Sequence, residues 1–187
     1  MTRRGWWLLL ALGWGLVAMG QSDLTEFPPG TTVMAWSLQG QDVPREQMLR
    51  LAVESRATGE FRVELAVEAV GTPEELGALG FLGSAFYLQS AGTDLDLAIF
   101  LSLFRRREVL EVGEVYQVGG GQFHVERTAE IAEITCLVGS YRSPARPGAE
   151  VGLGIALSDP VYFPPLLRLT EDGRVTFHMQ LVEYSRP

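Results

Sequence analysis

The 187-residue sequence predicts an all-β fold, a single antiparallel sandwich or partly open barrel with one short helix. Three observations lead to this prediction. Several segments alternate apolar and polar residues with the period of a half-buried strand. Turns that contain glycine separate those segments. Apolar residues make up 47% of the chain and charged residues 20%, which is the composition of one globular domain with a sizeable core.

The N-terminus predicts an export signal. Arg3 and Arg4 precede the uncharged apolar run GWWLLLALGWGLVAM, and Ala18-Met19-Gly20 then offers small residues at the usual cleavage spacing. The paired arginines are also typical of the twin-arginine export route. We therefore expect a signal peptide that ends at Gly20.

This leader divides the chain into residues 1–20, the signal peptide, and residues 21–187, an exported β-rich domain of the periplasm, cell envelope or extracellular space. The alternative is an uncleaved anchor, because Gly5 to Ser22 carries no charge. We expect the protein not to span the membrane unless this segment is retained.

The composition indicates which kind of genome encodes the chain and which class of partner is disfavoured. All 15 basic residues are arginine, lysine and asparagine are absent, and the formal net charge is −8. This bias is typical of a GC-rich bacterial genome. The acidic balance argues against a nucleic-acid partner, because nucleic-acid binders carry basic surfaces that neutralise phosphates.

Cys136 is the only cysteine, so the exported domain has no internal disulfide and its core must hold the fold unaided. In the stretch AEITCLVG, Cys136 shares a strand face with Ala132, Ile134 and Val138. No base near it in the sequence would activate the thiol. We expect a small buried hydrophobe rather than a nucleophile.

The first half of the mature chain predicts a β-hairpin around the turn Ala57-Thr58-Gly59. The stretch LRLAVESR alternates before the turn, although a helix from Asp42 to Gly59 competes with this interpretation. The stretch EFRVELAVEAV alternates after the turn. Its expected inner face consists of Phe61, Val63, Leu65, Val67 and Ala69.

Two later segments have helical features. The predicted short helix begins at Thr72 and ends by Gly80, with Pro73 at its first position. The stretch DLDLAIFLSLF is apolar on both strand faces, which suits a central covered strand or a buried helix. Arg105-Arg106-Arg107 follows it and is interpreted as a solvated turn rather than an anion site.

Two hairpins are predicted in the C-terminal half. Gly119-Gly120-Gly121 joins two extended runs, and no helix or lysine follows to make a phosphate loop, so these glycines form a turn. Asp172-Gly173 is a type I′ turn signal. The strand after this turn is expected to have four residues on its inner face: Val175, Phe177, Met179 and Leu181. A separate strand is predicted in the stretch EVGLGIAL. One of its faces would carry Gly152 and Gly154, and the other Val151, Leu153, Ile155 and Leu157.

The search for catalytic residues yields little. His124 and His178 are the only histidines, and Glu126 shares a face with His124. If their strands were neighbours, these groups would suit zinc or non-haem iron. No nucleophile elbow is present. We predict no catalytic residue, no cofactor and no metal, and expect both histidines to face solvent.

Tyr162 and Phe163 in the stretch VYFPP are the predicted binding residues. Prolines on both sides exclude a central strand, and aromatic side chains on a loop provide contact area at small entropic cost. Exposure of both rings is what a contact patch needs. The alternative is that both rings fold back and plug the end of the core.

These observations favour an exported, non-catalytic envelope protein that binds a protein or another envelope component through loops or a sheet edge. The alternative is a β-barrel carrier whose interior, lined by Phe86, Phe100 and Phe104, holds a small apolar ligand. A weaker alternative is a metal-dependent enzyme that uses His124 and His178.

Overall fold

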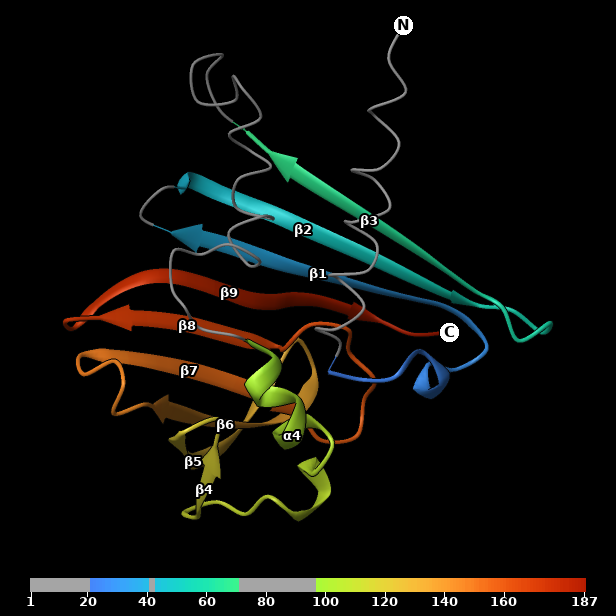
Figure 1. Ribbon diagram of the computed structural model, residues 1–187. Coiled ribbons are helices and arrows are strands. Elements are labelled where there is room, and N and C mark those ends of the chain that lie inside the picture. Colours follow the sequence, from blue (N-terminus) through green and yellow to red (C-terminus); the bar gives the residue numbers. More distant parts are fainter. Residues whose placement is uncertain (1–20, 41–42, 71–96) are drawn as a thin grey trace, which may run out of the picture.

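The structure is a computed structural model, and it describes residues 21–40, 43–70 and 97–187. The described part is nearly all antiparallel β: nine strands form one curved sheet in the order β3-β2-β1-β9-β8-β7-β6-β5-β4 (Figure 1). The single α-helix among the described residues is α4, Leu101–Phe104. The predicted all-β class is confirmed, with a single open sheet as its form.

The strands have the following bounds: β1 Gly30–Gly40, β2 Val43–Ser55, β3 Phe61–Ala69, β4 Val115–Val118, β5 Gly121–Ile131, β6 Ile134–Arg142, β7 Ala149–Ala156, β8 Leu166–Glu171 and β9 Arg174–Ser185. Three 3₁₀ segments accompany them: η1 Leu24–Glu26, η3 Leu97–Phe100 and η4 Arg107–Val109. Among these described segments, no helix is long and apolar enough to cross a membrane.

Two meanders build the sheet. Strands β1 to β3 follow one another, as do β4 to β9, and the pairing of β1 with β9 joins the two sets. The outer strands are β3 and β4, which are not neighbours, so the described strands do not close into a barrel. This openness corrects the closed barrel that the carrier alternative requires.

The core lies on the inner face of the sheet. Trp36 is paired with Leu49 of β2 on one side and with Leu181 of β9 on the other, and all three are buried. The helical segment that contains α4 lies in front of the sheet near β6 and β7 (Figure 1). Other fully buried members of this core are Met34, Leu38, Leu51, Phe100, Phe123, Leu153, Ile155, Leu167, Phe177 and Met179.

Alternation predicted the strands of the first hairpin correctly. Residues 43–55 form β2 rather than the competing helix, and Gly59 in the following turn has a φ of +81°. In β3, Leu65 is opposite the buried Leu51, as an inner-face residue should be. Even so, Val63 is 43% exposed and Leu65 39%, so this end of the inner face lacks the cover that alternation implied.

The glycine turns are confirmed. Gly119 and Gly120 have φ values of +50° and +78°, and Asp172 and Gly173 have +48° and +78°. Positive φ at both central residues is the signature of the type I′ turn, whose twist matches that of the flanking strands. Gly119-Gly120 is therefore the hairpin turn that connects β4 to β5.

Other predictions had mixed outcomes. Within the doubly apolar stretch before the arginine triplet, the described residues 97–104 form η3 and α4, so the helical alternative is correct there. Val175, predicted on the inner face of β9, is 52% exposed, whereas Phe177, Met179 and Leu181 are buried. Cys136 is buried, and this burial raises the pKa of its thiol to about 12. The predicted helix at residues 72–80 and Phe86 lie outside the described residues.

Candidate functional site

The loop of residues 157–165, between β7 and β8, carries the predicted binding pair. Tyr162 is 6% exposed and Phe163 3%, so the exposure expected of a contact patch is not found. Phe163 packs edge-on against Trp36 with ring centroids 5.4 Å apart, and the indole Nε1–H donates to the carbonyl oxygen of Pro164 at 3.0 Å. The loop is held against the sheet because the large indole of Trp36 on β1 offers both an apolar surface and a hydrogen-bond donor.

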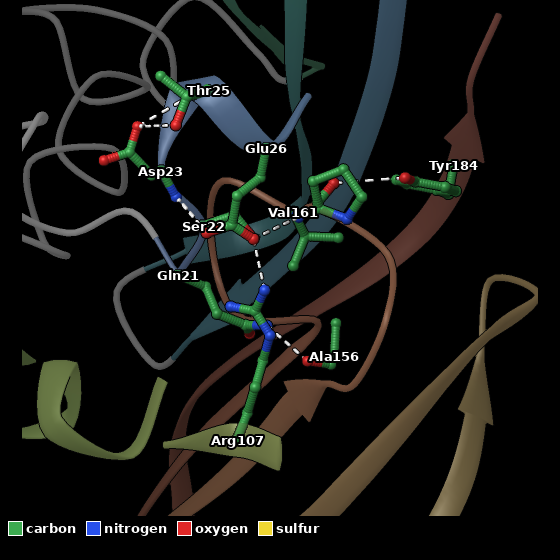
Figure 2. Close-up of polar contacts among 10 residues, drawn as sticks. Gln21, Ser22, Asp23, Thr25, Glu26, Arg107, Ala156, Val161 and Tyr184 are labelled. Atoms are coloured by element: carbon green, nitrogen blue, oxygen red, sulfur yellow. Dashed lines mark hydrogen bonds and ion pairs between the residues drawn. The ribbon is translucent and has the colours of Figure 1, made fainter. Parts of the chain in front are cut away.

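Residues 21–27, which we call the strap, dock on this loop (Figure 2). The Gln21 N–H donates to the Tyr162 carbonyl at 2.7 Å, and the Ser22 N–H donates to the Val161 carbonyl at 3.1 Å. The Val161 N–H donates in return to the Ser22 hydroxyl at 3.2 Å. These three bonds fix the backbone of Tyr162 and the start of the strap as one unit.

The Gln21 side chain is buried in this unit. Its Nε2 donates to the carbonyl of Ala156 at 3.1 Å, at the end of β7. Its Oε1 has no hydrogen-bond partner among the described residues. A buried acceptor without a donor is unfavourable, so a donor group that reached Gln21 would gain free energy there.

The far end of the strap is a capped 3₁₀ turn. Asp23 accepts from the Thr25 N–H at 3.0 Å, and Glu26 accepts from the Asp23 N–H at 3.0 Å, a reciprocal capping box. The hydrogen bond from the Thr25 backbone lowers the pKa of Asp23, because it favours the charged form. Glu26 also forms an ion pair with Arg107, which attaches the strap to η4 (Figure 2).

A groove lies between the strap, the segment from α4 to η4, and the loop. Its volume is about 790 Å³, which is within the range typical of ligand sites. Both apolar and charged groups line it. The apolar lining is Leu24, Leu101, Phe104 and Tyr162, and the polar lining is Gln21, Ser22, Asp23, Glu26, Arg105, Arg107 and Glu108.

Tyr162 is the link between the predicted pair and this groove. Its side chain contributes to the lining, and burial raises the pKa of its phenol, which therefore stays protonated at neutral pH. Phe163 packs against Tyr162 at a centroid distance of 5.1 Å and faces Trp36 instead. The binding role of the pair remains a prediction, in which Tyr162 would provide the contact and Phe163 its support.

The two histidines do not form the ligand set that the metal-enzyme alternative requires. His124 is on β5 and His178 is on β9, with three strands between them in the sheet. Burial, and then the charge of Arg168, lower the pKa of His178. Among the described residues, no group of three or more histidine, cysteine or carboxylate side chains could hold a metal ion. The geometry that the metal-enzyme alternative needs is therefore missing from this sheet.

The sequence did not predict two of the three walls of the groove, the strap and the segment from α4 to η4. One signal was available, since Asp23 and Glu26 have the spacing of a capping box. Arg107 had been assigned to a solvated turn, and its ion pair with Glu26 corrects this assignment. No sequence pattern connects residues 21–26 with residues 101–108, because only the tertiary fold brings them together.

Comparison with known proteins identifies related folds. No protein-family model matches the chain, and no curated protein matches its sequence. A crystal structure of MucB in complex with MucA(peri) superposes with a TM-score of 0.50 at 7% identity, over 92% of this chain and 55% of that one. The likeness is one of fold.

Two further structures resemble the chain. The complex of Pseudomonas aeruginosa MucA and MucB has a TM-score of 0.49 at 9% identity, covering 93% of this chain and 55% of the other. MucB alone has a TM-score of 0.48 at 9% identity, covering 93% and 58%. This chain therefore spans little more than half the length of the chains that it matches.

Proposed function

We propose that this chain is an exported, non-catalytic protein that binds a partner protein, or another component of the cell envelope, through the groove. The observation that carries the proposal is the groove itself, a hollow of about 790 Å³ whose lining includes both apolar and charged side chains. Such a lining suits a polypeptide segment, whose apolar side chains need burial and whose charges need partners.

The groove has side chains of opposite charge on two of its walls. Arg105 is exposed on the helical wall, whereas the carboxylate of Asp23 lies on the strap. A partner segment with an acidic side chain near Arg105 and a basic one near Asp23 would satisfy both. Electrostatic complementarity of this kind selects among partners more than it adds raw affinity.

Tyr162 is placed to act as the aromatic contact in the groove. Two strap bonds hold its backbone region, and Phe163 supports its ring from the core side. An aromatic ring that is already ordered loses little conformational entropy on binding. We therefore propose Tyr162 as the contact residue and Phe163 as the residue that positions it.

Two further observations support the proposal. MucB, whose structure has a similar fold, was crystallised in complex with MucA(peri), so this sheet architecture can occur in a protein that binds another protein. The leader pattern at residues 1–20 favours export, and therefore a function outside the cytoplasm. A carrier of a small apolar ligand is less well supported, because the sheet is open and charged groups line the groove.

The test is capture of partners from an envelope extract by four tagged single variants. Leu101→Asp and Arg105→Glu alter the groove, and Val175→Asp and Arg174→Glu make the same chemical changes at the exposed β8–β9 hairpin. We expect the groove variants to lose captured partners at least tenfold per folded molecule, while the hairpin variants retain them. Equal capture by all four folded variants would contradict the proposal.

A further inference from the structure

Strand β3 forms a long edge of the sheet that has charged residues on its outer face but neither a bulge nor a proline. Phe61–Ala69 pairs with β2 in continuous register, without a bulge, and no described strand pairs with its other side. The strand contains no proline and no lysine. Edges are normally blunted by such features, because free N–H and C=O groups recruit another strand. The opposite edge, β4, has only four residues.

The inner face of β3 is apolar and exposed. Val63 is opposite the buried Val53, and Leu65 is opposite the buried Leu51, yet both β3 residues remain accessible. Val70, directly after the strand, is exposed as well. A strand added beside β3 would satisfy its free backbone groups and cover these side chains at the same time.

The sequence of β3 is complementary to itself in one antiparallel register. A twofold axis perpendicular to the sheet keeps the inner faces of both copies on the same side, so one residue must lie opposite its own copy. With Leu65 on the axis, all nine residues of the strand are paired. Val63 then lies opposite Val67, and Phe61 opposite Ala69, on the inner face.

The outer face decides the register. With Leu65 on the axis, Arg62 lies opposite Glu68 twice, and Glu64 lies opposite the small Ala66. A slip that places Glu64 on the axis sets Glu64 against itself. A slip in the other direction, with Ala66 on the axis, sets Glu64 against Glu68. Like charges directly opposite destabilise a sheet and opposite charges stabilise it, so the first of these three registers is the favourable one. Placing Val63 on the axis also sets Arg62 opposite Glu64, but it pairs only residues 61–65 of the strand, whereas the first register pairs all nine.

We propose that β3 is a dimer surface, on which a second copy of this chain pairs antiparallel with Leu65 on the twofold axis. Charge complementarity and the exposed apolar face identify the occupant as a second copy. No groove residue belongs to β3, so this inference does not depend on the function proposed above. The Arg62–Glu64 ion pair within each copy is exposed, so Arg62 can turn to Glu68 of the partner.

The first test reverses charges in the full chain purified from an exporting host. Arg62→Glu and Glu68→Arg each place like charges opposite one another, and the double variant restores opposite charges. Sedimentation should show a concentration-dependent dimer for the parent and the double variant, and monomers for each single variant. A parent that stays monomeric up to millimolar concentration, or single variants that dimerise as well as the parent, would overturn the proposal.

The second test fixes the register by disulfide formation. In the proposed register Leu65→Cys faces its own copy, whereas Val63→Cys is four residues from its own copy. These two residues share a face and have similar exposure, which makes them a matched pair. The native Cys136 is buried and should not compete. Mild oxidation should link Leu65→Cys as a dimer and leave Val63→Cys unlinked, and the reverse result would overturn the register.

Discussion

Phe163 shows how a residue can be placed correctly on a loop while the sequence leaves its exposure open: its burial fits the alternative in which both rings plug the end of the core. Prolines on both sides did keep VYFPP out of the sheet, as the sequence predicted. The sequence could not decide between exposure and burial, because burial depends on Trp36, more than 120 residues away, whose indole donates to the carbonyl of Pro164. The sequence predicted the loop but not what lies beneath it.

Phe163→Ala should lower the free energy of unfolding by roughly 3 kcal/mol or more. The ring is buried against Trp36 and Tyr162, so truncation loses burial and leaves a cavity. Val175→Ala, at an exposed site, should shift it by at most about 0.5 kcal/mol. Denaturant unfolding of both variants measures the difference. A small effect at Phe163 would mean that the ring is not part of the core.

His178 predicts a pH dependence of stability. Its pKa is lowered from 6.5 in the folded state by burial and by Arg168, so the unfolded chain binds the proton more readily. Stability should therefore fall as the pH drops through 6.5 towards the folded-state pKa, and this contribution should be constant above 6.5. His178→Gln should flatten the profile between pH 7 and 5. Parallel profiles for parent and His178→Gln would contradict the assignment.

Cys136 should be unreactive in the folded protein. Burial, reinforced by Asp159, raises the pKa of its thiol to about 12, so almost no thiolate exists at pH 8. Treatment with a chromogenic disulfide reagent should label one thiol per chain in denaturant and none within the same time in buffer. Rapid labelling in buffer would mean that the inner part of β6 opens readily.

At the scale of elements, alternation predicted the strands well, but it predicted poorly which of their residues are buried. Period-two patterns correctly predicted β2, β3 and β9, because successive side chains of a strand point to opposite faces of the sheet whatever the strand packs against. They could not show that Val63 and Leu65 stay exposed, since exposure depends on neighbouring elements. The same limit left residues 97–104 open between strand and helix. Apolar faces on both sides are compatible with either element.

The turn between β5 and β6 escaped sequence analysis and stores strain. Ala132 and Glu133 have φ values of +47° and +66°, the left-handed region that residues with a Cβ atom rarely adopt. Asn-Gly is the pair that suits such a turn. The stretch AEIAEITC carries no glycine or asparagine, and it therefore reads as one uninterrupted strand.

Replacing this turn should stabilise the protein. Ala132→Asn combined with Glu133→Gly should raise the free energy of unfolding by about 1 kcal/mol, because the strained φ values become favourable. Gly173→Ala is the converse change, at a φ of +78°, and should lower it by a similar amount. Thermal and denaturant unfolding compare the variants. A loss of stability on introducing Asn and Gly would contradict the strain argument.

At the scale of the whole molecule, the sequence predicted the class but not the connectivity. Hairpin neighbours follow from turn residues, whereas the β1–β9 contact joins strands more than 130 residues apart without any local signal. The groove has the same origin, since its walls come from the strap, from α4 to η4 and from the loop. Tyr162 was predicted, and its neighbours Leu101 and Arg105 were not, because only the fold places them beside it.

The central claim, that the groove binds a partner, is tested most directly by photo-crosslinking in the native host. A benzophenone amino acid would replace Leu101 or Glu108 in the groove, and Val115 on β4 or Val175 on the β8–β9 hairpin as exposed controls. The account predicts that both groove positions crosslink the same partner on illumination and that neither control does. Crosslinks to that partner from the controls but not from Leu101 or Glu108 would contradict it.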